Sequence, residues 1–358
     1  MKVGIVGLPN AGKSTLFNAL TNADAETGEY PFTTIDPNIA VVPVPDERLP
    51  HIAATVGATE LVPQTISFAD IAGLVRGASE GEGLGNRFLA AIRETDAICH
   101  VVRCHDAAGV AHTEGRIDPV ADAELVEAEL YAADLEQAQA RQERVTKDAR
   151  SGSKEAAAER DWLEVVVDGL AAGRPVREFA PPVETHDAPA RLQALTSKPM
   201  LYVANVSEGV EAPPAELIEH VRAAGAGIVA ISARVEAELG ELDDAAEAAE
   251  LRAELGLGDS GLQRLVRAAF DLLDLITFFT AHEGAEATAR SLRRGSAAWD
   301  AAGRVHTDFQ TKFVRAEVIG WQDLVELGGY AAARERGRLR TEGREYVVSA
   351  GDVLTFRI

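Results

Sequence analysis

The sequence predicts an α/β chain in which a mainly parallel sheet carries an inserted antiparallel helical hairpin and is followed by a small α+β domain. Three observations support this fold class. Short apolar runs of strand character are separated by helical stretches, residues 118–187 show no strand pattern, and short β-like pieces with Gly turns follow Leu275. Strands that alternate with helices form parallel sheets with helices on both faces.

Length and composition indicate a globular protein of several domains. At about 150 residues per domain, the 358 residues correspond to two or three domains. Hydrophobic residues make up 46% and charged residues 26%, which is ordinary for a globular chain. The two cysteines, Cys99 and Cys104, cannot form a disulfide framework, which indicates a reducing compartment. No signal-like start and no run of about 20 apolar residues is present, so we expect a cytoplasmic protein without a membrane segment.

The first expected domain comprises residues 1–117 and 188–275. Lys2–Val6 is expected to form a buried strand, Gly7–Gly12 a loop and Lys13–Leu20 a helix. Four more strands are expected within this domain. They are Thr65–Asp70, Ala97–Val102, Pro199–Ala204 and Gly227–Ile231.

Residues 118–187 are expected to form the helical hairpin. Leucines and valines recur there among Ala, Glu, Gln and Arg, and a break at Ser151-Gly152-Ser153 divides the segment. The pattern predicts two long antiparallel helices joined by a short turn. Because the apolar content is thin, we expect the hairpin to project from the body. Residues 276–358 are expected to form the α+β domain, with strands near 276–281, 343–348 and 353–358 and a helix near 322–327.

A complete phosphate-binding motif follows the first expected strand. Gly7–Ser14 reads GLPNAGKS and matches the P-loop pattern G-x-x-x-x-G-K-[ST] between a strand and a helix. Its glycines let backbone N–H groups converge on phosphates, with the positive end of the helix behind them. Lys13 is expected to reach the β- and γ-phosphates, and the Ser14 hydroxyl to ligate Mg²⁺. The expected phosphate-binding residues are Asn10, Ala11, Gly12, Lys13, Ser14 and Thr15.

Two further motifs fit the same site. Asp70-Ile71-Ala72-Gly73 ends an expected strand, where Asp70 can hold Mg²⁺ and the Gly73 amide can contact the γ-phosphate. Thr33-Thr34 lies in a loop after the first helix, where Thr34 can ligate Mg²⁺ when a triphosphate is bound. Both motifs, in this order behind a P-loop, predict a nucleoside-triphosphatase.

These motifs resemble those of the Obg-related translation-factor NTPases, and they are most similar to the YchF (Obg-like ATPase) branch. The resemblance rests on GLPNAGKS, on YPFTTIDPN after Glu29, and on the run Asp70–Phe88. In the C-terminal segment, His306–Phe309, Arg315–Ile319 and Gly351–Val353 are similar to a TGS domain. The resemblance covers the whole chain and implies an ATPase that binds the ribosome, through its large subunit or ribosomal RNA.

The expected base-binding loop departs from the guanine-binding pattern N-K-x-D. After the strand Pro199–Ala204 the chain reads Asn205-Val206-Ser207-Glu208, so Val206 replaces the Lys and Glu208 the Asp. The longer carboxylate cannot occupy the same place, whereas the Asn205 amide can pair with N6 and N7 of adenine. The altered motif favours ATP, as the resemblance also implies, and relaxed specificity is the alternative. Ser232-Ala233 fits the last base-contacting loop.

The group that positions the hydrolytic water is not the usual one. Related enzymes often carry Gln after D-x-x-G, but this chain carries Leu74. His112, in a loop after the strand Ala97–Val102, is a candidate for this catalytic role, and the alternative is a structural histidine. Asn10 fits the pattern of relatives in which a P-loop Asn helps to bind K⁺; the alternative is a turn residue.

Charge is distributed unevenly along the chain. The net charge is −22, residues 118–187 carry −9, and residues 290–358 carry +3. A basic end on an acidic body suggests a polyanion partner for the C-terminal domain, and chance is the alternative. Three functions remain open: a ribosome-binding ATPase, a GTPase in ribosome assembly, and a nucleotide-dependent adaptor with negligible turnover.

Overall fold

The computed structural model describes the chain except residues 26–37, 72–83, 107–115, 243–244 and 255–259. The described residues group into two compact units. The first comprises 1–42 and 67–269, and the second comprises 43–66 and 270–358. The described part of the chain contains no helix long and apolar enough to cross a membrane.

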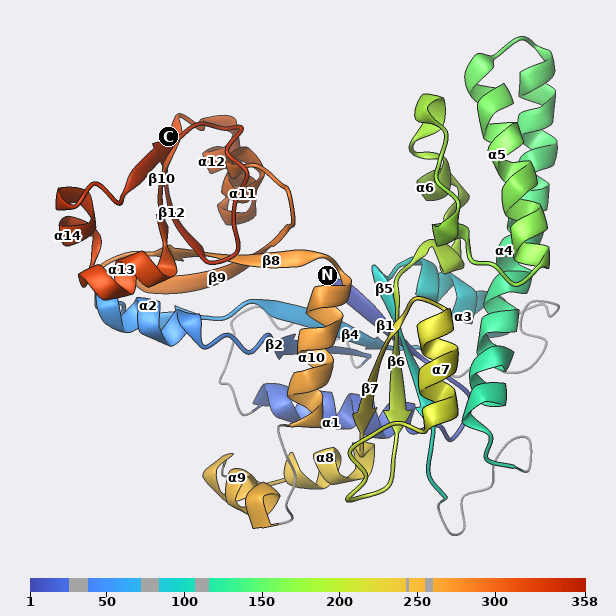
Figure 1. Cartoon of the computed structure of the whole chain (residues 1–358), viewed down its shortest axis with the longest axis horizontal. Coiled ribbons are helices and arrows are strands. Elements are labelled where there is room, and N and C mark those ends of the chain that lie inside the picture. The colour runs from blue at the N-terminus through green and yellow to red at the C-terminus, as the bar shows by residue number, and fades with distance from the viewer. Residues whose placement is uncertain (26–37, 72–83, 107–115, 243–244, 255–259) are drawn as a thin grey trace. The chain divides into compact units, whose positions relative to one another are not determined.

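A six-stranded sheet forms the centre of the first unit (Figure 1). Strand β1 pairs in parallel with β4 and β5, β5 with β6, and β6 with β7, as the alternation of strands and helices predicts. In spatial order the strands are β2 (Ile39–Pro43), β4 (Thr65–Asp70), β1 (Lys2–Val6), β5 (Ala97–Arg103), β6 (Met200–Asn205) and β7 (Gly227–Ile231).

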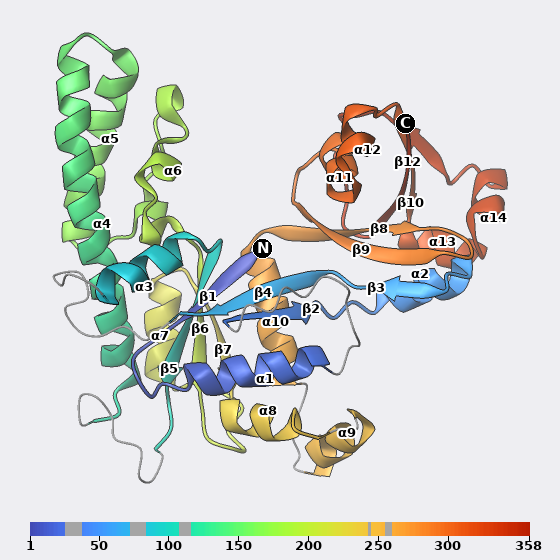
Figure 2. The ribbon, with the colours of Figure 1, turned by 180° about the vertical axis from the view of Figure 1, so that it is seen from behind.

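Helices bury the apolar side chains of this sheet. On one face, side chains of α3 (Leu84–Arg93), α4 (Pro119–Arg150) and α7 (Ala215–Ala223) share a core with Val6, Ile98 and Tyr202 of the strands. The helix α1 (Lys13–Ala25) follows the P-loop and packs against α8 (Ala233–Leu239), and both are seen from behind in Figure 2. The helices α9 (Ala245–Glu254) and α10 (Gly261–Leu272) follow α8.

The predicted hairpin is present and consists of α4 and α5 (Lys154–Ala171). The proximal part of α4 covers the sheet with Ala123, Val126 and Leu130. Its distal part packs with α5 around Ala138, Val145 and Trp162 and extends beyond the sheet (Figure 1). The chain returns through three short 3₁₀ turns and α6 (Ala188–Leu192).

A buried carboxylate fastens this return segment to α4. Asp134 has no solvent exposure, and its two oxygens accept hydrogen bonds from Leu195 N at 2.8 Å, Thr196 N at 2.7 Å and Thr196 Oγ1 at 2.7 Å. Burial raises the pKa of Asp134, and these three donors work against that rise. The carboxylate therefore substitutes for backbone partners that the irregular segment lacks.

Replacing Asp134 with alanine is expected to destabilise the first unit by about 3 kcal/mol, because buried donors lose their acceptor. Urea denaturation of the purified chain measures the change. The matched control is Asp168→Ala on α5, where the carboxylate is exposed. Equal stability of the two variants would contradict a fastening role for Asp134.

A second six-stranded sheet forms the C-terminal unit. The strands in spatial order are β11 (Arg340–Glu342), β10 (Arg315–Gly320), β12 (Asp352–Arg357), β8 (Leu275–Ala281), β9 (Glu286–Arg293) and β3 (Glu60–Val62). One core contains α2 (Arg48–Val56) and α13 (Trp321–Leu327), and another contains α11 (Ala298–Val305). The short helices α12 (Thr307–Thr311) and α14 (Tyr330–Glu335) complete the unit.

The observed fold class is the predicted one, with two local differences. Residues 43–66, expected in the first domain, belong to the C-terminal unit because Ile52 and Val56 of α2 share a core with Phe279. Residues 343–348, expected to form a strand, are a turn with one isolated bridge at Val347, because Tyr346 N bonds Gly343 O across the turn. The three-part division of the chain stays a prediction.

Candidate functional site

The P-loop connects β1 to α1 through a backbone path that needs glycine at two points. Gly7 has φ 153°, and a Cβ there would lie 2.4 Å from the Val101 carbonyl oxygen. Gly12 has φ 101°, and a Cβ there would lie 2.2 Å from Asn205 Nδ2. Asn10 adopts the left-handed region at φ 62°, which asparagine tolerates better than most residues. Atoms of β5 and β6 therefore lie so close to the loop that only glycine fits at these two positions.

Lys13 lies at the start of α1 and folds back over the loop. The side chain is 8% exposed, and Nζ donates to the Leu8 carbonyl oxygen at 2.8 Å. Burial lowers the pKa of Lys13, whereas the negative charge of Asp70 raises it. Burial likewise raises the pKa of Asp70, and Lys13 lowers it. The P-loop cation and the acid at the end of β4 thus act on each other electrostatically.

Oxygen ligands of the kind that Mg²⁺ prefers are present in the described part of this site. Ser14 is exposed in the first turn of α1, beside the exposed Thr15. Asp70 is half-buried at the carboxyl end of β4, where its N–H donates to the Asn38 carbonyl oxygen at 3.0 Å. Hydroxyl and carboxylate oxygens suit a hard divalent cation. These donors fit the expected metal.

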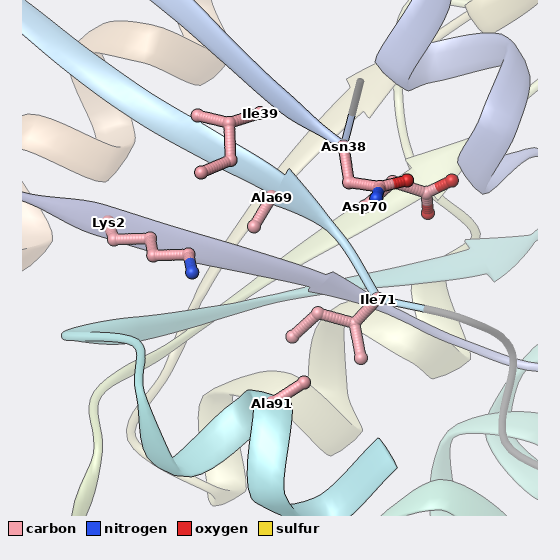
Figure 3. A pocket seen from close by; sticks show the side chains of 7 residues that line it. All are labelled: Lys2, Asn38, Ile39, Ala69, Asp70, Ile71 and Ala91. Atoms are coloured by element: carbon pink, nitrogen blue, oxygen red, sulfur yellow. The ribbon is translucent and has the colours of Figure 1, made fainter. Parts of the chain in front are cut away.

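A cavity of about 310 Å³ adjoins Asp70. Figure 3 shows Asp70 beside Asn38 at the end of β4, with Lys2 on the adjacent β1. The remaining lining residues are Ile39, Ala69, Ile71 and Ala91. The carboxylate of Asp70 therefore borders open space rather than a closed core.

Asn205 connects the P-loop to the expected base-binding loop. Its Nδ2 donates to the Ala11 carbonyl oxygen at 2.9 Å, and its Oδ1 accepts from Ala233 N at 3.1 Å. Nδ2 also lies 3.3 Å from His105 Nε2, and the residue is 4% exposed. The expected pairing of this amide with adenine N6 and N7 would compete with these bonds. In the structure Asn205 holds two loops together.

Comparison with known proteins agrees with this arrangement of elements. A family model described as "50S ribosome-binding GTPase" matches residues 2–129, and the YchF-GTPase_C model, described as a protein of unknown function, matches residues 275–358. The chain is 44% identical to the ribosome-binding ATPase YchF of Bacillus subtilis, covering 100% of this chain and 99% of that one. The chain belongs to the YchF family.

Other relatives agree with this assignment. The Haemophilus influenzae ribosome-binding ATPase YchF is 45% identical, with 99% of this chain and 98% of that protein covered. Among solved structures, the Schizosaccharomyces pombe YchF GTPase matches with a TM-score of 0.89 and 34% identity, covering 100% of this chain and 97% of that one. The YchF architecture therefore spans the whole chain.

In this YchF chain the other base-site residues lie in different settings. Val206 is 3% exposed and its side chain belongs to the core between the sheet and α7, so it offers a nucleotide only its backbone. Glu208 is exposed; the pKa of Arg234 is raised mainly by its hydrogen bond to Glu238, with a smaller contribution from the charge of Glu208. Ser232 is half-buried at the N-terminus of α8, and Ala233 is buried beside it. Thr34, Gly73 and His112 lie outside the described residues.

Two features near the site are not among the residues predicted for it. The first is His105, which follows β5 and approaches Asn205, and its position after an apolar strand is a usable signal. The second is a half-buried polar cluster between β6, α4 and α7, in which Glu127 accepts from Tyr202 Oη at 2.5 Å and lies 2.8 Å from His220 Nε2. His100 packs against Tyr202 with ring centroids 5.1 Å apart, and burial lowers its pKa to about 4.

Both cysteines are poor nucleophiles in this fold. Burial raises the pKa of Cys99 and of Cys104 to about 12. A thiol must ionise to react with an oxidant, so neither has the properties of a redox sensor. Cys99 is buried in β5 and Cys104 packs against the core directly after it, so both act as packing residues.

Proposed function

We propose that the chain is a ribosome-associated ATPase that hydrolyses ATP to ADP and phosphate and acts as a nucleotide-controlled translation factor. The P-loop carries the proposal, because Gly7 lies against Val101 of β5, and Asn205 of β6 lies against Gly12 and donates to the Ala11 carbonyl oxygen. The names of the YchF relatives support ATP and the ribosome as partners. The large ribosomal subunit or its RNA is the proposed contact, which puts the activity in the cytoplasm.

The phosphate chain is proposed to lie along the P-loop. Backbone N–H groups from Asn10 to Thr15 surround it, and the Lys13 ammonium leaves Leu8 O to contact the β- and γ-phosphates. Ser14, Asp70 and Thr34 are the residues proposed to hold Mg²⁺, which neutralises charge on the phosphates when bound. Asn10 is the candidate ligand for K⁺. The Gly73 amide is proposed to contact the γ-phosphate.

The attacking water needs a positioning group that Leu74 does not supply. His112 is proposed for this role, because an imidazole near neutral pH can hold or accept a proton. If no group in the chain orients the water efficiently, turnover alone is slow and depends on the partner. Such slow turnover would leave the adaptor hypothesis open.

ATP is proposed as the preferred nucleotide because Glu208 stands where a guanine-binding site needs a shorter carboxylate. A specific observation favours the alternative, a GTPase: the matching family description and the solved relative both use that word. Competition between ATP and GTP, measured by calorimetry on the purified chain with Mg²⁺, separates the two. Tighter binding of GTP would reject the ATPase proposal.

Replacing Glu208 with aspartate is expected to shift the ratio of ATP to GTP affinity toward GTP by about tenfold. The shorter carboxylate can accept from guanine N1–H and the N2 amino group, and hydrogen bonds to a charged group are worth roughly 1.5–3 kcal/mol. The control is Glu211→Asp, another exposed glutamate beyond β6. An unchanged ratio would mean that Glu208 does not face the base.

A further inference from the structure

We propose that His105 is a positioning residue of the nucleotide site. Its ring nitrogen Nε2 accepts a hydrogen bond from the side-chain amide of Asn205, and the ring carries its one proton on Nδ1. This role rests on the proposed nucleotide site at the P-loop. It adds to that site a residue that belongs to none of the phosphate-binding or base-binding motifs of the sequence.

The amide of Asn205 fits between its backbone partners in one orientation only. The Ala11 carbonyl oxygen, which can only accept, lies 2.9 Å from Nδ2, and the Ala233 N–H, which can only donate, lies 3.1 Å from Oδ1. Turning the amide by half a rotation would place two acceptors together at Ala11 and two donors together at Ala233. Both contacts are buried, where such mismatches are costly. The atom that faces His105 is therefore Nδ2.

This orientation fixes the protonation of the His105 ring. Nδ2 carries two hydrogens, and one of them is donated to the Ala11 carbonyl oxygen. The other is left for His105 Nε2, which lies 3.3 Å from Nδ2. A neutral imidazole has one N–H and one lone pair, so the lone pair must be on Nε2 and the proton on Nδ1. A proton on Nε2 would set two donors against each other.

The backbone holds His105 at this place before any ligand binds. Arg103 of β5 is the register partner of Asn205 on the neighbouring strand β6 (Figure 1), and Cys104 N donates to the Asn205 carbonyl oxygen at 2.9 Å. The Arg103 side chain then turns back, and its Nε donates to the His105 carbonyl oxygen at 3.1 Å. Arg103 is 2% exposed, so this bond is shielded from water. The ring is thus preorganised beside the amide.

His105 completes the set of bonds that holds Asn205 against the P-loop. The fit there is close, since a Cβ on Gly12 would lie 2.2 Å from Nδ2. Without an acceptor at position 105, one N–H of the buried amide is left unpaired, and the amide must shift toward another partner. Such a shift moves the Ala11–Gly12 backbone, whose N–H groups are proposed to surround the phosphates. His105 should therefore affect phosphate binding and not the choice of base.

The test compares three single variants of the full chain with the parent. His105→Leu removes the acceptor, His105→Gln keeps an acceptor oxygen at nearly the reach of Nε2, and His51→Leu is the matched control on the exposed face of α2. Calorimetry with ADP and with inorganic tripolyphosphate, each with Mg²⁺, measures affinity. Urea denaturation records whether each variant folds.

His105→Leu is expected to bind both ligands roughly three- to tenfold more weakly, which corresponds to one hydrogen bond between neutral groups. His105→Gln should restore parental affinity to within about twofold, because it accepts from the same N–H. The control should match the parent. In an Asn205→Ala background, His105→Leu should change affinity by less than about twofold, since the two residues act through one contact.

Nuclear magnetic resonance tests the proton position directly. Two-bond correlation of ring hydrogens with nitrogens, in the chain labelled with ¹⁵N-histidine, distinguishes a nitrogen with a proton from one with a lone pair. The His105 signals are those missing from the His105→Gln spectrum. At pH 8, where free imidazole is neutral, Nε2 should give the signal of an unprotonated nitrogen and Nδ1 that of a protonated one.

Three results would overturn the role of His105. They are a proton on Nε2 at pH 8, parental affinity for both ligands in His105→Leu, and weaker binding in His105→Gln equal to that in His105→Leu. A full additional loss in the Asn205→Ala background would show that His105 does not act through Asn205. If the parent bound neither ADP nor ATP, the proposed function would fail instead, and the resonance measurement would still judge the contact between the two side chains.

Discussion

Replacing Lys13 with alanine is expected to reduce ATP turnover by a factor on the order of 10²–10³, because one cationic contact to the transferring phosphoryl group is lost. The loss also removes the cation that lowers the pKa of Asp70. Binding of ATP should weaken as well, because the phosphates lose a cationic partner. Steady-state release of phosphate and calorimetry with ATP measure the two consequences.

Lys312→Ala is a suitable control, since this exposed lysine lies in the C-terminal unit, outside the P-loop. That variant should retain parental turnover. If Lys13→Ala binds and hydrolyses ATP as the parent does, the assignment of the P-loop as the nucleotide site is wrong.

Replacing Asn205 with alanine is expected to weaken binding of ATP, of GTP and of inorganic tripolyphosphate alike. The substitution leaves the Ala11 carbonyl and the Ala233 N–H without their partner. Each buried group that loses its hydrogen bond costs about 1–3 kcal/mol, so a fall in unfolding free energy of roughly 2–4 kcal/mol is expected as well. Urea denaturation and calorimetry with the three ligands are the measurements.

Tripolyphosphate has no base, so it separates two roles for Asn205. If Asn205 only recognised adenine, the alanine variant would bind ATP more weakly but would keep its stability and its affinity for tripolyphosphate. That result would contradict a role in holding the two loops together. Asn205→Asp refines the test. It keeps an acceptor for Ala233 N, but its second carboxylate oxygen faces the Ala11 carbonyl oxygen, so it should lose at least as much stability and affinity as the alanine variant.

Local pattern was sufficient to predict the strands of the first sheet. Lys2–Val6, Thr65–Asp70 and Gly227–Ile231 have the bounds expected from their apolar runs. The hairpin also followed from local signals, since Ser153 caps α5 and the turn falls at Ser151–Ser153. These elements carry their own periodicity, capping residues and turn residues, so their neighbours add little information.

Elements that depend on distant partners were not predictable. The helix α2 belongs to the C-terminal unit because its apolar face packs with Phe279, more than two hundred positions later in the chain. β3 pairs with β9 through Glu60 and Glu286 in the same unit. Nothing in the sequence near 43–66 indicates which core will receive these side chains.

The phosphate side of the site was easier to predict than the base side. The P-loop motif predicts its own backbone conformation, and Gly7 and Gly12 adopt the positive φ that this conformation needs. In the base loop, residue type did not show which way each side chain points. The Val206 side chain joins the core, and the Asn205 amide is bonded between two loops. Such roles depend on which backbone groups lack partners, and only the three-dimensional structure supplies that.

We propose that this YchF chain couples ATP hydrolysis at the P-loop to the ribosome. The most direct test measures phosphate release from ATP by the parent chain with and without purified ribosomes, beside Lys13→Ala under the same conditions. The parent alone should hydrolyse ATP slowly, ribosomes should accelerate its turnover, and the variant should show neither activity. Ribosome-dependent ATP hydrolysis that persists at the parental rate in Lys13→Ala would contradict this coupling.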